Sequence, residues 1–193
     1  MNKTQKKKKK MEKELYQACS DGKVEDVRKL VQNSQININW KNKNDSLQTP
    51  FYIACYNGHI DIVKLLLNDN RVDINEANIY GVTPYWIACY VGQTEIVKLL
   101  LNDNRVDINK AEKDGWTSLH IACQNGHIEI VKLLLNDNRV DINKATTSGW
   151  TPFYIACYQE KTEVVKYLLE SEKEMDINKK DNNGKTGLDW AKQ

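Results

Sequence analysis

The chain has 193 residues, of which 40% are hydrophobic and 28% are charged, proportions typical of a folded domain with a polar surface. The formal net charge is +2, and it becomes −3 without the five consecutive lysines Lys6–Lys10. This mildly acidic body argues against a broad basic face for nucleic acid. No apolar run approaches the roughly 18 residues of a membrane span.

Residues 1–12 are dominated by the lysine run, and a run of like charges predicts a disordered, solvated tail. Two functional interpretations stand beside that one: a nuclear address, or an electrostatic contact with anionic lipid or nucleic acid through Lys6, Lys7, Lys8, Lys9 and Lys10. No apolar stretch follows the basic run, so no secretory signal is expected. The lack of a secretory signal and the odd number of cysteines, five, together predict a reducing intracellular location, cytoplasmic or nuclear.

Behind the tail, a 34-residue repeat organises the chain. "TPFYIACYNGHIDIVKLLLNDNRVDIN" begins at Thr49, and similar copies begin at Thr83, Thr117 and Thr151, the last with one extra residue. A weaker copy begins at Lys13, and "TGLDWAKQ" from residue 186 begins one more. Repetition at such a period indicates a solenoid, in which each unit buries its apolar face against its neighbours.

Each unit predicts two short helices and a turn. Thr49 and Pro50 are typical of a helix start, because proline tolerates the first turn of a helix. Gly58 breaks the first helix, and the apolar residues of "HIDIVKLLLND" recur at helical spacing. In "NDNRVDIN" we expect an asparagine to end the second helix in a left-handed conformation.

These residues resemble the ankyrin repeat family in the Thr-Pro helix start, Ala54 of "IAC", the Gly58–His59 turn, the "EIVKLLL" helix and the following "DIN". The resemblance implies an all-α fold, an α-solenoid of stacked helix-turn-helix units with short hairpin tips. It covers residues 13–193, as a capping unit at 13–48, repeats at 49–82, 83–116, 117–150 and 151–185, and a partial repeat at 186–193. The family's usual period is 33 residues, so we expect a longer loop at "LLLNDNRVDIN".

The repeat also affects how the Cys-His pairs are interpreted. In a single copy, Cys55 four residues before His59 suggests a catalytic or metal-binding pair. A cysteine follows the alanine of each first helix, at positions 19, 55, 89, 123 and 157, which favours a small buried packing residue. His120, Cys123 and His127 have the spacing of an open three-ligand zinc site, but the resemblance implies that His120 is a structural hydrogen-bonding residue. We therefore expect no metal, no cofactor, no catalytic residue and no enzymatic activity.

The resemblance implies that partners bind in a groove between the hairpin tips and the exposed side of the first helices. Tyrosine and tryptophan there favour this interpretation, since both are common interface hot spots. For Trp116 and Trp150, packing within the molecule is an equal alternative, and Tyr52, Trp86 and Tyr154 are expected to pack between repeats. The candidate partner-binding residues are Tyr56, Ile79, Tyr80, Val82, Tyr90, Val91, Trp116, Gln124, Asn125, Trp150, Tyr158 and Gln159.

The predicted function is that of a monomeric, non-enzymatic scaffold or adaptor that holds another protein in a preorganised groove. The alternative is an adaptor whose location is set by the lysine run, through weak contact with anionic membrane or nucleic acid.

Overall fold

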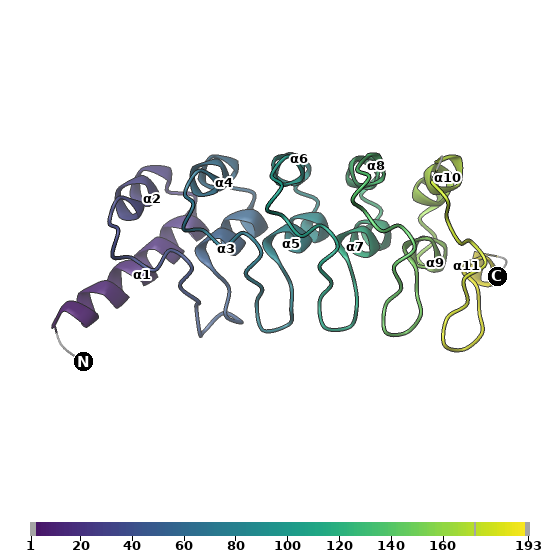
Figure 1. Cartoon of the computed structure of the whole chain (residues 1–193), viewed down its shortest axis with the longest axis horizontal. Coiled ribbons are helices and arrows are strands. Elements are labelled where there is room, and N and C mark those ends of the chain that lie inside the picture. The colour runs from purple at the N-terminus through teal and green to yellow at the C-terminus, as the bar shows by residue number, and fades with distance from the viewer. Residues whose placement is uncertain (1–2, 172, 192–193) are drawn as a thin grey trace.

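The computed structural model describes residues 3–171 and 173–191, which form paired helices stacked in a line. Hairpin loops project below the inner layer of helices, as Figure 1 shows. The inner layer contains α1 (Lys3–Asp21), α3 (Pro50–Asn57), α5 (Pro84–Val91), α7 (Ser118–Asn125), α9 (Pro152–Tyr158) and α11 (Gly187–Ala191). The outer layer contains α2 (Val24–Val31), α4 (Ile60–Leu67), α6 (Thr94–Leu101), α8 (Ile128–Asn136) and α10 (Thr162–Glu170).

The expected all-α solenoid is therefore confirmed, with each inner helix packed against the inner helices of the neighbouring units. Residues 192–193 of the predicted partial repeat lie outside the described residues, as do residues 1–2 of the predicted tail.

The inner helices α3, α5, α7 and α9 begin in the same way. A threonine in extended conformation precedes each of them, and its side chain accepts a hydrogen bond from the backbone N–H three residues on. Gly58 ends α3 at φ 77°, a left-handed conformation that costs a residue with a Cβ roughly 1–2 kcal/mol. A Cβ at Gly58 would also lie 2.7 Å from the Gln93 side chain, so the turn requires glycine for two reasons.

The five cysteines lie in the core, all of them buried and free of disulfides. Burial raises the pKa of each thiol, so the thiols stay protonated and are poor nucleophiles. The core itself is one continuous apolar cluster that runs from Leu15 in α1 to Leu168 in α10. The prediction that the cysteines pack in the core is confirmed.

Neighbouring hairpins are joined by backbone hydrogen bonds near their tips. The Lys113 N–H donates to the Tyr80 carbonyl at 3.1 Å, and the Thr147 N–H donates to the Asp114 carbonyl at 2.9 Å. Equivalent bonds join the hairpins on either side of these. The hairpins thus form one connected edge that is ordered along the length of the stack.

The loop that contains the inserted residue binds the preceding unit. Arg71 contacts both carboxylate oxygens of Asp69 and donates through Nη2 to the Val31 carbonyl at 2.6 Å. An arginine from one unit therefore caps the C-terminus of the previous outer helix, where carbonyls lack helical partners. Arg105 and Arg139 make the same contacts with the ends of α4 and α6.

This arrangement corrects the expected left-handed asparagine. Asn68, which follows α4, has a right-handed conformation with φ −77° and ψ −6°. Asn102 after α6 is the same. The chain needs no left-handed residue here because the arginine of the next unit satisfies the free carbonyls instead.

A ladder of asparagine side chains runs parallel to the arginines. Asn75 donates through Nδ2 to the Arg105 carbonyl at 2.6 Å, and its Oδ1 accepts from the Asp107 N–H at 2.9 Å. Each asparagine therefore makes two bonds to the backbone of the next unit. The other members of this ladder are Asn39, Asn109 and Asn143.

The lysine run is helical, which corrects the prediction of a disordered tail for residues 3–12. Residues 3–12 belong to α1, which extends beyond the stack (Figure 1). Lysine has a good helix propensity, and the buried segment from Glu12 to Cys19 already nucleates the helix, so each further lysine only lengthens it. Lys6–Lys10 are all exposed. Within the described residues, no helix combines the length and apolar character needed to cross a membrane.

Candidate functional site

One position in each of the inner helices α1, α3, α5, α7 and α9 reaches the hairpin of the next unit. His120 accepts at Nδ1 from the Thr117 N–H at 3.2 Å, and its Nε2 lies 2.9 Å from the Trp150 carbonyl. Trp86, at the equivalent position, donates from Nε1 to the Trp116 carbonyl at 2.9 Å. The predicted packing between repeats is therefore confirmed at this position. The tyrosines that bond the following hairpin from the same position are Tyr16, Tyr52 and Tyr154.

These bonds also account for the histidine of the zinc-like cluster. Both ring nitrogens of His120 are occupied, and burial lowers its pKa to about 4, so the ring is neutral at pH 7. Cys123 is buried with a raised pKa. In the part of the chain that the structure describes, no group of three His, Cys, Asp or Glu side chains is placed to hold a metal ion.

The residues around each turn bind the preceding inner helix. The Gln93 side chain donates to the Tyr56 carbonyl at 3.3 Å, and Nε2 of His127 lies 3.0 Å from the Tyr90 carbonyl. Asn125, a predicted partner-binding residue, donates to the same Tyr90 carbonyl at 2.8 Å. Its side-chain amino group is thus used to tie α7 to the end of α5.

The tryptophans at the hairpins pack on other rings. Trp116 and Trp150 are half-buried and meet edge to face, with ring centroids 6.1 Å apart. Trp150 also stacks on Tyr154 at 5.6 Å and on Tyr158 at 5.8 Å, while Trp190 meets Tyr158 edge to face at 5.1 Å. Of the two interpretations left open for Trp116 and Trp150, this geometry favours packing within the molecule.

Tyr56, Tyr90 and Tyr158 occupy equivalent positions on α3, α5 and α9 and remain 44%, 44% and 42% exposed. Gln124 holds the same position on α7 and is half-buried. We call these four residues the tyrosine row. Within the described residues, neither the three hydroxyls nor the Gln124 amide has a hydrogen-bond partner. The row therefore offers apolar rings with polar groups free to bond.

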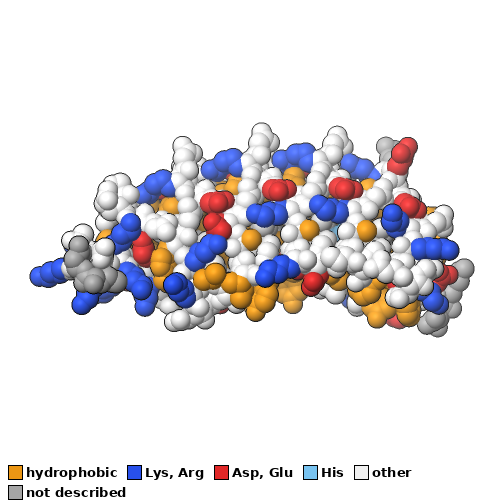
Figure 2. Space-filling view, turned by 60° about the horizontal axis from the view of Figure 1, so that its bottom comes forward, with side chains coloured by type: hydrophobic (Ala, Val, Ile, Leu, Met, Phe, Trp, Pro, Cys, Tyr) orange, Lys and Arg blue, Asp and Glu red, His pale blue; other side chains and the backbone are white. Residues whose placement is uncertain are grey.

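The hairpin candidates divide into exposed and buried residues. Ile79 and Tyr80 stand at a tip and are 40% and 55% exposed. Val82 was expected in the groove, but its side chain is buried, because it precedes the Thr83 cap and packs into the core. Figure 2 shows hydrophobic side chains gathered in two areas along one edge of the visible face.

Several predicted residues come together in one shallow hollow on the inner side. Among its side chains there is no carboxylate, and within the described residues Lys161 has no ion pair. Sequence reasoning missed His127 and Lys161 as members of this hollow. The signal for Lys161 was present, since it replaces the histidine or glutamine of the turn. The lining residues are Tyr90, Val91, Gln124, Asn125, His127, Gln159 and Lys161.

Comparison with known families agrees with this geometry. A family model described as ankyrin repeats in three copies matches residues 70–146, 104–181 and 138–193, and one described as ankyrin repeats in many copies matches residues 30–88. The chain belongs to the ankyrin repeat family. Ankyrin repeats are typically protein–protein interaction modules and are generally not catalytic. No curated protein matched the chain.

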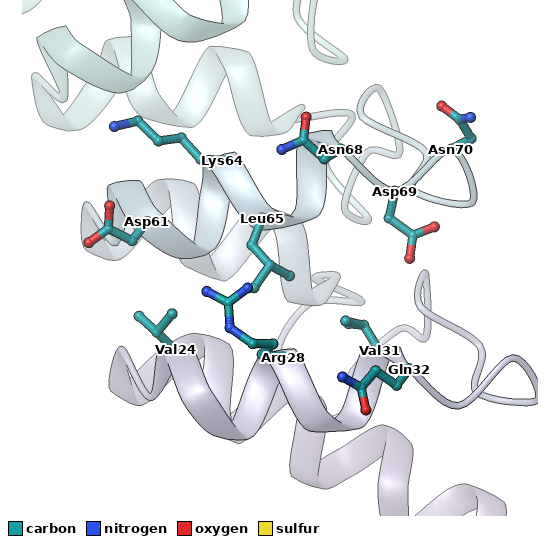
Figure 3. A pocket seen from close by; sticks show the side chains of 10 residues that line it. All are labelled: Val24, Arg28, Val31, Gln32, Asp61, Lys64, Leu65, Asn68, Asp69 and Asn70. Carbon is teal, nitrogen blue, oxygen red and sulfur yellow. The ribbon is translucent and has the colours of Figure 1, made fainter.

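A further hollow lies on the outer side of the ankyrin stack, between α2 and α4. Figure 3 shows Leu65 pointing from α4 toward α2, with the Arg28 side chain reaching up beside it. Asp61 and Lys64 also line this hollow, so both signs of charge are present, and none of its lining residues is aromatic. The exposed tyrosines lie instead on the inner side of these ankyrin repeats. Aromatic residues of this kind are enriched at interface hot spots, so the inner side is the better candidate for a binding surface.

Proposed function

We propose that this chain is a non-enzymatic adaptor that binds a partner protein through the groove between the tyrosine row and the hairpin tips. The observation that carries the proposal is the exposure of Tyr56, Tyr90 and Tyr158, whose hydroxyls bond nothing among the described residues. Amphipathic rings in this state gain both apolar burial and hydrogen bonds when a partner covers them. We further propose that the chain acts as a monomer and is located in the cytoplasm or the nucleus.

The rigid framework supports this proposal. Threonine caps, the asparagine ladder and the hairpin bonds hold the inner helices in place before any partner arrives. Ordering a groove on binding costs about 0.5–1.5 kcal/mol for each immobilised side chain. A surface that is already ordered avoids much of that cost, so its rings contribute more of their burial energy to affinity.

The test compares partner capture with stability. Full-length chain carrying Tyr56→Ala, Tyr90→Ala and Tyr158→Ala together is used as bait in extracts of the native cell, beside the unchanged chain. We expect the captured proteins to fall by roughly tenfold or more, as for hot-spot residues. The thermal unfolding midpoint should fall only by what the ring contacts of Tyr90 with Trp86 and of Tyr158 with Trp150 and Trp190 contribute. Undiminished capture, or a large loss of stability without a specific loss of capture, would assign the rings to the framework.

Trp116→Ala is the matched control for this experiment. The Trp116 ring packs on Trp150 and against His120, so its removal should lower the unfolding midpoint more than it lowers capture. Light scattering of the same samples checks that the chain is a monomer, and a fluorescent fusion checks its location.

We propose a second candidate function for the lysine run, because Lys6–Lys10 are exposed on a helix that extends beyond the stack. Seven lysines between Lys3 and Lys13 favour contact with an anionic membrane, at about 1 kcal/mol per lysine near the surface. Changing Lys6–Lys10 to glutamine should then abolish sedimentation with phosphatidylserine vesicles. If the same change also abolished partner capture, the groove-centred proposal would be wrong.

A further inference from the structure

We propose that the tyrosine row binds a proline-rich segment in the polyproline II conformation, with one residue in three contacting one position of the row. This inference rests on the proposed function, because it names the class of partner for the same groove. The segment would present apolar residues to Tyr56, Tyr90 and Tyr158 and a polar residue to Gln124.

The spacing of the row supports this conformation. Adjacent packed helices lie about 8–10 Å apart, so neighbouring positions of the row recur at roughly that interval. Polyproline II has three residues per turn and a rise of about 3.1 Å, so every third side chain recurs on one face after about 9.3 Å. A β-strand presents one face every two residues, or about 6.7 Å, and falls out of step after one unit.

Among the described residues, the row and its neighbour Gln159 carry unbonded hydrogen-bond donors, which favours a bound segment whose backbone carbonyls are available to accept. The side-chain amides of Gln124 and Gln159 have no partner within the described residues, nor do the hydroxyls of Tyr90 and Tyr158. Polyproline II has no internal hydrogen bonds, so its carbonyls are available to these donors. An α-helix repeats on one face after about 10.5 Å, but its carbonyls are already bonded internally.

The shape of the row also suits such a segment. Tyr56, Tyr90 and Tyr158 each present a single exposed ring, so the row is a narrow line of contacts rather than a broad apolar stripe. Aromatic-lined grooves are the usual docking sites of polyproline II segments, which lose little entropy because they are ordered before binding. A broad stripe of apolar positions at i, i+3, i+4 and i+7 would instead be needed for an amphipathic helix.

The positive charge of Lys161 in the hollow predicts an acidic residue in the bound segment. Lys161 and His127 line the hollow beside Gln124, no carboxylate does, and Lys161 has no ion pair among the described residues. A carboxylate between the residues opposite Gln124 and Tyr158 would pair with Lys161. The segment therefore carries the pattern apolar-x-x-apolar-x-x-polar-x-x-apolar, in either chain direction, with an acidic residue beside the polar step.

The test is a selection from a phage library of random peptides of about 16 residues, which is long enough to span the four positions. Full-length chain is the immobilised target, and parallel selections use Gln124→Tyr and Leu169→Ala. Leu169 is exposed on the outer helix α10, so its variant is a matched control for removal or addition of apolar surface. Thermal unfolding of every target shows that it is folded.

We expect proline and other apolar residues at three-residue spacing, interrupted by one polar step. With Gln124→Tyr the interruption should become apolar, and with Leu169→Ala the pattern should be that of the unchanged chain. A synthetic peptide of the enriched sequence should bind with a Kd raised roughly tenfold by Tyr90→Ala, as at a hot spot. Lys161→Ala should weaken the same peptide only when its acidic residue is present.

Three results would overturn the inference: no enriched peptides, enrichment at a seven-residue spacing typical of a helix, or an unchanged pattern with Gln124→Tyr. These outcomes are separable from failure of the proposed function. If the triple tyrosine variant still loses its cellular partners, the groove binds a protein but not in this conformation. If capture is unaffected by the tyrosines, the proposed function itself is wrong.

Discussion

His120 makes the stability of the stack depend on pH in a predictable way. Its side chain is fully buried, bonded at Nδ1 to Thr117 and at Nε2 to the Trp150 carbonyl. Burial lowers the pKa to about 4 from 6.5, although the bond to Trp150 acts in the opposite direction. The unfolded chain therefore binds a proton near pH 6.5 that the folded chain does not bind until about pH 4. Stability is full above pH 6.5 and falls as the pH is lowered.

The size of the effect follows from the same two values. One pKa unit corresponds to about 1.4 kcal/mol, so the free energy of unfolding should fall by about 2 kcal/mol by pH 5 and by about 3 kcal/mol below pH 4. The assay is urea unfolding at pH 7 and pH 5, followed by far-ultraviolet circular dichroism. The carboxylates of Asp69, Asp103 and Asp137 have lowered pKa values because of their arginine partners, so they titrate below this window.

The matched variant is His120→Trp, since Trp86 makes the equivalent bond one unit earlier and does not titrate. His59 and His127 are present in both proteins and cancel in the comparison. We expect the unchanged chain to lose about 2 kcal/mol more than the variant between pH 7 and pH 5. Equal losses in the two proteins would refute the assignment of this pH dependence to His120. If the tryptophan variant does not fold at pH 7, His120→Gln replaces it.

Two further predictions concern the framework. Arg105→Lys removes the two-point contact with Asp103 and the bond to the Leu67 carbonyl, and should lower the free energy of unfolding in urea by about 1 kcal/mol. Arg28→Lys, which alters the exposed pair of Arg28 with Glu25, should change it far less. Equal effects would contradict the role of Arg105 in capping α4. Gly92→Ala should lower the thermal unfolding midpoint more than Gly184→Ala. Both glycines have a left-handed φ, but only at Gly92 would the new Cβ meet a neighbour, the His127 ring at 2.9 Å. Equal shifts would contradict a steric contribution from His127 and leave backbone strain as the whole effect.

The stack could be predicted from the sequence because its signals are local and recur in register. A threonine before α3, α5, α7 and α9, a glycine after α3, α5 and α7, and apolar residues at helical spacing each specify one feature of one unit. Repetition then removes the ambiguity that a single copy would leave, as it did for the cysteines. These are short-range rules, and they hold here because each unit contacts only its neighbours.

The features that were missed depend on partners in another unit. Arg71 lies close in sequence to Asp69, but the Val31 carbonyl that it caps is 40 residues away. The asparagine ladder joins residues about one repeat apart in the same manner. Nothing within one copy of "NDNRVDIN" indicates which of its side chains point toward a neighbour. A search for polar residues that recur where no local structure needs them would have marked both ladders.

The helical lysine run was missed for a different physical reason. The prediction lets repulsion among like charges decide the conformation, but for residues 3–12 the neighbouring helical segment decides it. Leu15 and Cys19 are fully buried, so they fix the helix to which the lysines are attached. Lysine opposes extension of a helix only through its charge, which water and salt screen at exposed positions.

The candidate site was predicted only in part, and Gln124 shows which part matters. The helix that carries it, α7, begins at a threonine cap and ends at a left-handed glycine, as do α3 and α5 with their tyrosines. The same backbone therefore forms with or without a ring at this position. The tyrosine at 56 and at 90 cannot then be explained by the needs of the helix, and the surface that they form is what a partner would contact. Tyr158 is the weaker member of the row, because Trp150 and Trp190 already pack against its ring. Tyr90 is also partly engaged, since its ring stacks on Trp86 with centroids 5.6 Å apart, whereas Tyr56 makes no ring contact within the described residues. Substitution of Tyr56 is consequently the cleanest separation of binding from folding that this chain offers.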